Sequence, residues 1–74
     1  MTRIDPAQIT ADIAETLGVP AAEVAPDDRL DDLGLDSIRT MELVERWRAA
    51  GIDIEFADLA AERDVAAWIA VLAR

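Results

Sequence analysis

The chain changes from loop to helix within residues 32–38, which read Asp32-Leu33-Gly34-Leu35-Asp36-Ser37-Ile38. Gly34 indicates a turn that sets the direction of the residues after it. Asp36 has a side chain suited to the N-cap position, so Ser37 would lie in the first helical turn. Because Gly51 marks an end, the pattern predicts a helix over about residues 37–50.

A first helix is predicted upstream, over residues 6–17. Asp5 suits the N-cap, Pro6 the first helical position, and Gln8 follows the cap by three residues. Gly18 can close the helix in the left-handed conformation. Ile4 and Ile9 are placed as a hydrophobic staple at its start. Ile9, Ile13 and Leu17 recur every four residues and form one apolar stripe.

The segment between these helices, residues 18–36, has no clean period and contains Pro20 and Pro26. Loops longer than about 12–15 residues in a compact domain are usually functional or disordered. We expect an ordered loop, because apolar side chains can pack the segment onto the core: Val19, Val24, Leu30, Leu33 and Leu35.

Residues 52–55 alternate apolar and acidic side chains, but no second strand is available to pair with them. We therefore expect an extended crossing segment, followed by a short helix over about residues 56–61. Asp64 then suits the N-cap of a last helix with apolar residues at helical spacing. The sequence thus predicts an all-α fold, a four-helix bundle of three main helices and one short helix with a long first loop, in a single domain over residues 1–74.

The helical stripes also predict the core. The apolar arc of the helix over residues 37–50 covers roughly 220°, wider than one packing face needs. Ile38 and Met41 lie near its rim, where burial and exposure to a partner are both open. The residues expected in the core are Ile9, Ile13, Leu17, Leu33, Leu43, Val44, Trp47, Leu59, Val65, Trp68, Ile69 and Leu72.

The composition of the 74 residues excludes several kinds of chemistry. There is no Cys and no His, which excludes disulfides, zinc sites with thiolate or imidazole ligands, and the ordinary imidazole acid or base. Ser37 cannot be a nucleophile of a hydrolytic triad, because no His exists to activate it. We therefore expect no catalytic residues and no resident metal, and a reactive group that another molecule supplies.

The charge balance is 16 acidic residues against 7 Arg, a formal net charge of −9. Nucleic acids and anionic membranes are disfavoured as partners, since both attract a basic face. Basic protein partners or a divalent cation are favoured. The longest apolar run, residues 65–73, is shorter than the roughly 20 residues that span a bilayer, and no signal-peptide pattern begins the chain. These features predict a cytoplasmic protein.

Ser37 and Asp36 together suggest phosphate chemistry. A phosphate ester on Ser37 would be favoured by the free amides and dipole of a helix N-terminus. Asp36 could help to hold a divalent metal at which a phosphate is transferred. The alternative is that Ser37 is only a polar residue of a first helical turn.

Residues 32–38 resemble the attachment motif of the phosphopantetheine carrier proteins, which include acyl, peptidyl and aryl carriers. The likeness extends to the capped first helix, the long loop, and the short third and capped fourth helices. It implies that Ser37 carries a 4′-phosphopantetheine arm, added from coenzyme A by a phosphopantetheinyl transferase. The thiol of the arm would hold the cargo as a thioester, which explains the missing cysteine.

Two further patterns are similar to the aryl carrier domains of catechol-siderophore synthetases: Ser37-Ile38-Arg39-x-Met41-x-Leu43-x-x-Arg46-Trp47-Arg48 and Asp53-Ile54-x-Phe56-x-x-Leu59-Ala60. This likeness implies an aryl acid as cargo, and an adenylation enzyme and a condensation domain as partners of a monomeric carrier. The chain lacks the isochorismatase domain of the bifunctional siderophore proteins, so we expect a free-standing or excised carrier. A peptidyl carrier loaded with an amino acid, or an unmodified acidic helical adaptor, remain alternatives.

The same resemblance implies a partner interface beside the arm. Ile38 and Met41 would line one side of Ser37, while Phe56 and Ala60, one turn apart, would lie on the other. Apolar residues exposed together usually mark a binding surface. The alternative for Phe56 is a core position that closes the short helix.

Overall fold

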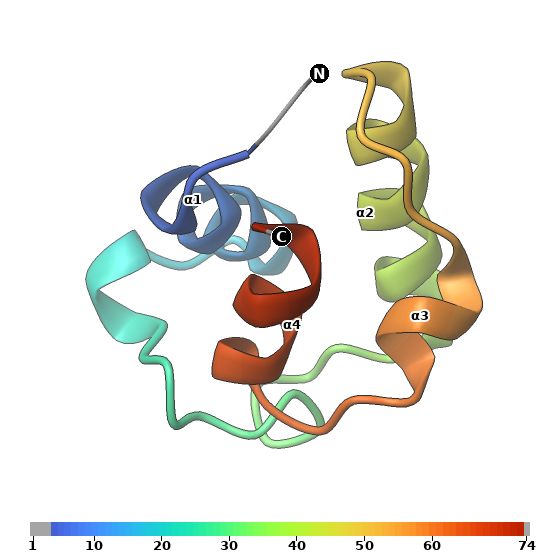
Figure 1. Ribbon diagram of the computed structural model, residues 1–74. Helices are drawn as coiled ribbons and strands as arrows, with labels where there is room; N and C mark the ends of the chain where they lie inside the picture. The colour runs from blue at the N-terminus through green and yellow to red at the C-terminus, as the bar shows by residue number, and fades with distance from the viewer. Residues whose placement is uncertain (1–3, 74) are drawn as a thin grey trace.

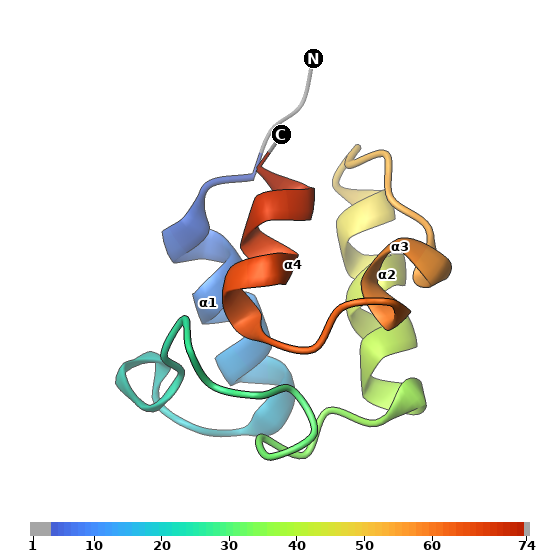
Figure 2. The same ribbon diagram turned by 60° about the horizontal axis from the view of Figure 1, so that its bottom comes forward.

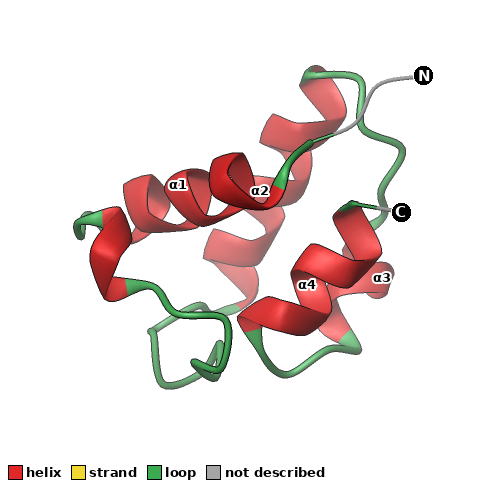
Figure 3. Ribbon diagram, turned by 60° about the vertical axis from the view of Figure 1, so that its left-hand side comes forward, coloured by secondary structure: helices red, strands yellow, loops and turns green. Residues whose placement is uncertain are grey.

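The computed structural model describes residues 4–73, which form four α-helices and one short 3-10 helix (Figure 1). The helices are α1 (Pro6–Leu17), α2 (Ser37–Ala49), α3 (Phe56–Ala60) and α4 (Val65–Leu72), and the 3-10 helix is η1 (Ala21–Glu23). Residues 4–73 contain no β-strand, only an isolated bridge between Arg29 and Asp64 (Figure 3). The predicted all-α four-helix bundle is confirmed.

Helix α1 has the predicted bounds because both of its ends are capped as expected. The Asp5 Oδ1 atom accepts the backbone N–H of Gln8 at 2.8 Å, and Gly18 closes the helix with φ 73°. The side chain of Gln8 does not reach back to the cap. Its amide nitrogen instead donates to Asp12 Oδ1 at 2.8 Å, which adds Gln8 to a polar network on the inner face of α1.

Helices α2 and α3 each end one residue before the predicted limit. Helix α2 stops at Ala49 because the chain reverses at Gly51, where φ is 94°. The amide of Ile52 then donates to the carbonyl of Trp47 at 2.9 Å, which closes the helix end. Helix α3 stops at Ala60, and residues 52–55 are extended as expected.

The segment over residues 18–36 is ordered, and sequence reading missed the η1 turn within it. Backbone hydrogen bonds attach it to the start of α4: Leu30 N to Arg63 O at 2.9 Å, Val65 N to Asp28 O at 3.2 Å, and Ala66 N to Pro26 O at 2.8 Å. Figure 2 shows the segment passing the N-terminal end of α4 on its way to the start of α2. The start of α2 thus lies at the opposite end of the bundle from the start of α1.

The core is larger than predicted and reaches beyond the helices. Leu17, Leu33 and Ile69 are only partly buried at its margin, because their helix or loop positions lie toward solvent. The other predicted core residues are buried. The buried apolar residues that the predicted core omits lie mainly in the first loop and the crossing segment, where no helical period marks them: Ile4, Ala14, Val24, Leu30, Leu35, Ile52 and Ile54.

Asp12 is a buried charged residue that sequence reading missed. It is 5% exposed, and its Oδ2 accepts the indole N–H of Trp47 at 2.8 Å. Arg46 lies 3.6 Å from Asp12 and donates to Glu15 at 2.8 Å. The hydrogen bond to Glu15, followed by the charge of Asp12, raises the pKa of the Arg46 guanidinium. The carboxylate of Asp12 is therefore buried with its partners in place.

The fully buried side chains of α2 should dominate stability. Replacing Leu43 or Trp47 by Ala is expected to lower the free energy of unfolding by about 2–5 kcal/mol, through lost burial and the cavity left behind. Urea or thermal unfolding followed by circular dichroism measures the loss. Glu45→Gln is the matched control on the exposed face of α2 and should stay within about 0.5 kcal/mol. Unchanged midpoints for both Ala variants would contradict this core.

Candidate functional site

Ser37 is the first residue of α2 and is exposed. Asp36 is the N-cap, and its Oδ1 accepts the backbone N–H of Arg39 at 2.9 Å. Its carbonyl accepts the N–H of Thr40 at 2.9 Å. The amides of Ser37 and Ile38 make no hydrogen bond with the described residues, because they precede the first helical turn's own acceptors.

Ser37 is exposed but its backbone is held firmly on both sides. Before it, the loop folds back on itself through Leu35 N to Leu30 O at 3.0 Å, with Gly34 in the left-handed region at φ 89°. Leu35 is buried at 9% exposure, and Thr40, three residues after Ser37, is buried at 6%. The buried side chains of Leu35 and Thr40 therefore anchor a short exposed segment that presents Ser37.

The charges around Ser37 are mostly unpaired and face solvent. Asp31 is paired with Arg29 at 3.4 Å, whereas Asp32, Asp36 and Arg39 take part in no ion pair among the described residues. Within residues 4–73 no group of three or more acidic side chains is placed to hold a metal ion. Among the described residues, Asp36 is the carboxylate that lies next to Ser37 in the sequence.

A phosphate ester on Ser37 fits these surroundings. The side chain meets no buried wall and no competing hydrogen-bond partner, and two free amide donors lie at the same helix end. A phosphate needs such donors and tolerates exposure to water. Among the described residues, none is hydrogen-bonded to the Ser37 hydroxyl.

A hollow of about 410 Å³ lies beside Ser37 and brings together most of the residues expected at a partner interface. Ile38 and Met41 line it with 70% and 41% exposure, and Phe56 lines it from the start of α3. Phe56 is also partly buried and packed against the core, and its role at an interface stays a prediction. Glu42 and Glu45 complete the lining.

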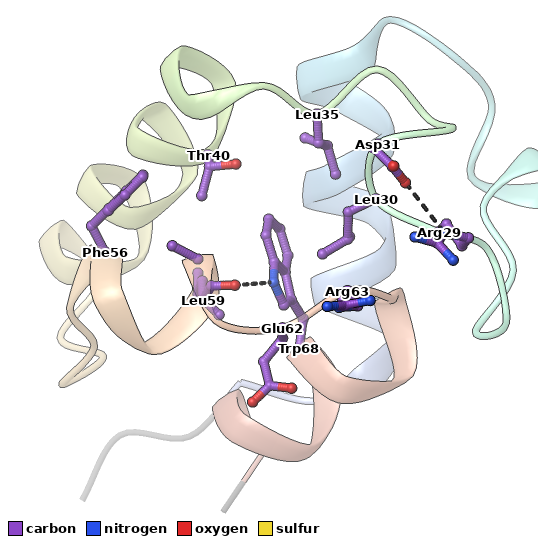
Figure 4. A pocket seen from close by; sticks show the side chains of 11 residues that line it. Arg29, Leu30, Asp31, Leu35, Thr40, Phe56, Leu59, Glu62, Arg63 and Trp68 are labelled. Carbon is purple, nitrogen blue, oxygen red and sulfur yellow. Dashed lines mark hydrogen bonds and ion pairs between the residues drawn. The ribbon is translucent and has the colours of Figure 1, made fainter.

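Ala60 does not join that hollow. It is exposed on α3 and lines a neighbouring hollow of about 300 Å³, whose lining Figure 4 shows. Phe56 borders both hollows. Phe56 and Ala60 were expected together on one side of Ser37. Of the two, only Phe56 lines the hollow beside Ser37. Sequence reading missed this second hollow, because its walls come from the first loop, α2, α3 and α4 together.

A known family model matches most of the chain, including the region around Ser37. The model described as phosphopantetheine attachment site matches residues 7–72, nearly the whole chain. It covers the four helices, except the first residue of α1, and the loop that leads to Ser37.

Several curated proteins are similar to the chain. Phenyloxazoline synthase MbtB of Mycobacterium sp. (strain MCS) is 50% identical over 60 residues, which are 81% of this chain and 5% of the synthase. Pyochelin synthetase PchE of Pseudomonas aeruginosa (strain UCBPP-PA14) is 47% identical over 68 residues, 88% of this chain and 5% of the synthetase. The isochorismatase of Bacillus subtilis (strain 168) is 38% identical over 60 residues, 81% of this chain and 19% of that protein.

The chain thus spans about a twentieth of the length of MbtB and PchE. No solved structure matches it. Among the residues that the structure describes, no helix is long and apolar enough to cross a bilayer.

Proposed function

Because the chain belongs to the phosphopantetheine attachment family, whose members carry 4′-phosphopantetheine on a serine, we propose that Ser37 is the attachment residue of a single carrier domain over residues 1–74. One observation carries this assignment. Ser37 is the only serine in the sequence, and it lies exposed at the start of α2. No second residue of the required type competes with it.

In this proposal the chain presents the Ser37 hydroxyl, and the transferase carries out the attachment reaction. Ser37 presents its hydroxyl on an exposed helix start, and the amides of Ser37 and Ile38, which bond to no described residue, could donate to a phosphate attached there. Asp36 holds the helix start through one carboxylate oxygen, and its other oxygen is free to bind a divalent cation during transfer. When attached, the arm supplies a terminal thiol that can hold an acyl group as a thioester.

Carriers of this family are generally non-catalytic. We extend this to the present chain, which has no His or Cys.

An aryl acid is the cargo that the similarities favour. The three relatives are a phenyloxazoline synthase, a pyochelin synthetase and an isochorismatase, and the patterns around Ser37 and Phe56 resemble aryl carriers. In the structure, the two arginines of that pattern are in ion pairs, Arg46 with Glu15 and Arg48 with Glu55. A peptidyl carrier for an amino acid is the second candidate, and loading a panel of aryl and amino acids by the neighbouring adenylation enzyme separates the two.

The proposed partners follow from this role. They are a phosphopantetheinyl transferase, an aryl-acid or amino-acid adenylation enzyme, and a condensation domain of nonribosomal peptide or siderophore-like biosynthesis. The exposed apolar side chains of Ile38 and Met41, with Phe56 and Ala60, form the proposed docking surface. The net charge of −9 opposes self-association, so we propose a monomeric carrier. We propose the cytoplasm as its location.

Ser37→Ala should abolish modification. After incubation with coenzyme A and a broad-specificity transferase, peptide mass spectrometry is expected to find the arm on the wild-type peptide that contains Ser37. The variant should carry no arm at all. An adduct that persists on Ser37→Ala would refute the assignment and leave an unmodified adaptor or another attachment residue.

Asp36→Ala should slow modification while leaving the fold largely intact, because a lost N-cap costs about 1 kcal/mol. The control is Asp64→Ala, which removes the equivalent cap of α4, where Asp64 Oδ1 accepts the N–H of Ala67 at 2.8 Å. The transfer rate, measured by mass at timed points, should fall for Asp36→Ala alone. Wild-type rates in Asp36→Ala would show that Asp36 acts only on the helix.

Met41→Glu and Ala60→Glu should impair the condensation step and spare the earlier steps. A charge on this surface opposes the burial of apolar anchors, so product release by the condensation partner should fall at least about tenfold. Arm transfer and aryl loading should survive. Ala22→Glu in η1 adds the same charge at another exposed alanine and is the control. Equal activity of all variants in the three assays would remove this surface from the account.

A further inference from the structure

Arg48 connects the end of α2 to the start of α3. Its Nη1 atom lies 3.1 Å from the Glu55 Oε1 atom in an ion pair, and the same nitrogen donates to the carbonyl of Ile54 at 3.4 Å. Glu55 is the N-cap residue of α3, and Ile54 is the buried residue before it. One guanidinium group therefore holds two consecutive residues at the point where α3 begins.

This ion pair is a contact between two elements and not a local feature of α2. Glu45 precedes Arg48 by three residues on the same helix, a spacing at which opposite charges can pair. Among the described residues, however, Arg48 pairs only with Glu55. Both side chains are more than half exposed, so the pair contributes little to the stability of the whole bundle. Its effect is therefore expected on the position of α3.

Helix α3 depends on tertiary contacts because it has only five residues, too few for a helix to be stable alone. Its C-terminal half is fixed by Leu59, which is fully buried and whose carbonyl accepts the indole N–H of Trp68 at 2.9 Å. Its first residue, Phe56, is only partly buried. Arg48 thus acts on the end of α3 that is less firmly packed.

Phe56 links this contact to the surface beside Ser37. It lines the hollow of about 410 Å³ together with Met41 of α2. Arg48 follows Met41 by seven residues, so the two lie on the same face of α2, two turns apart. Figure 1 and Figure 2 both show the crossing segment running back along α2 to α3. The face of α2 that exposes Met41 therefore also carries the residue that holds the start of α3.

We propose that Arg48 is a positioning residue of the docking surface. By pairing with Glu55 it fixes the start of α3, and with it the place of Phe56 relative to Met41. The inference rests on the proposed function, to which the docking surface belongs. Since this surface is proposed to act in the condensation step, removing the pair should weaken that step and spare arm transfer and aryl loading.

The first measurement is hydrogen exchange at the backbone amides of α3 in the unmodified full chain. Arg48→Gln removes the charge and should speed this exchange at least about threefold, while the amides of α1 and α4 keep their wild-type rates. The reason is that loss of a local contact opens the element it holds. Arg46→Gln is the matched control, since it removes the ion pair with Glu15 and should leave exchange in α3 as in wild type.

The second measurement separates positioning from direct contact with the partner. In the condensation assay, Arg48→Gln should raise the KM for the loaded carrier at least about threefold and change kcat less than about twofold, because docking is weakened and the chemistry is not. Glu55→Gln should have the same effect. The double variant should be no worse than either single variant, since both remove one interaction. Arg48→Lys, which keeps the charge, should restore most of the wild-type KM.

Wild-type exchange in α3 of Arg48→Gln, or equal acceleration throughout the chain, would overturn the inference. So would a raised KM for Arg48→Gln together with a wild-type KM for Glu55→Gln, because the guanidinium would then contact the partner itself. These results would leave Ser37 as the attachment residue. A wild-type chain that takes no arm would refute the proposed function and the link to condensation, whereas exchange in the unmodified chain would still decide whether Arg48 holds α3.

Discussion

Two tryptophans connect all four helices of this small domain. Trp47 of α2 and Trp68 of α4 meet edge to face, with ring centroids 6.2 Å apart and planes at 86°. The indole N–H of Trp47 is bonded to Asp12 of α1, and that of Trp68 to the Leu59 carbonyl of α3. Aromatic pairs of this geometry contribute beyond their buried area. Because each indole also fixes a polar partner, the pair sets how α2 and α4 lie against the rest of the bundle.

The position of Ser37 depends on that arrangement. The start of α4 holds the first loop through the hydrogen bonds Leu30 N to Arg63 O and Ala66 N to Pro26 O. The loop then buries Leu35 immediately before the Asp36 cap. The packed core thus leaves Ser37 exposed at the start of α2, with its backbone held on both sides by buried residues.

Much of this fold could be predicted from local sequence, and the exceptions have a common cause. Asp5, Asp36 and Asp64 cap their helices as expected, because capping depends only on nearby residues. The loop residues Val24, Leu30 and Leu35 follow no helical period. The sequence could therefore suggest that they pack onto the core, but not which of them are fully buried. Asp12 lies beside the Ile9–Ile13 stripe, which could have marked it as unusual, but its partner Trp47 is 35 residues away.

At the candidate site, Ser37 and its cap follow from sequence. The separation of Ala60 from Met41 arises only from tertiary packing.

The central claim is that this domain carries one phosphopantetheine arm. Intact mass spectrometry of the wild-type chain, after reaction with coenzyme A and a broad-specificity phosphopantetheinyl transferase, tests it most directly. We expect complete conversion to a single species with one added arm, because the sequence contains one serine. A chain that stays unmodified although its circular dichroism shows the folded helical bundle would contradict the claim, as would a chain that gains two arms.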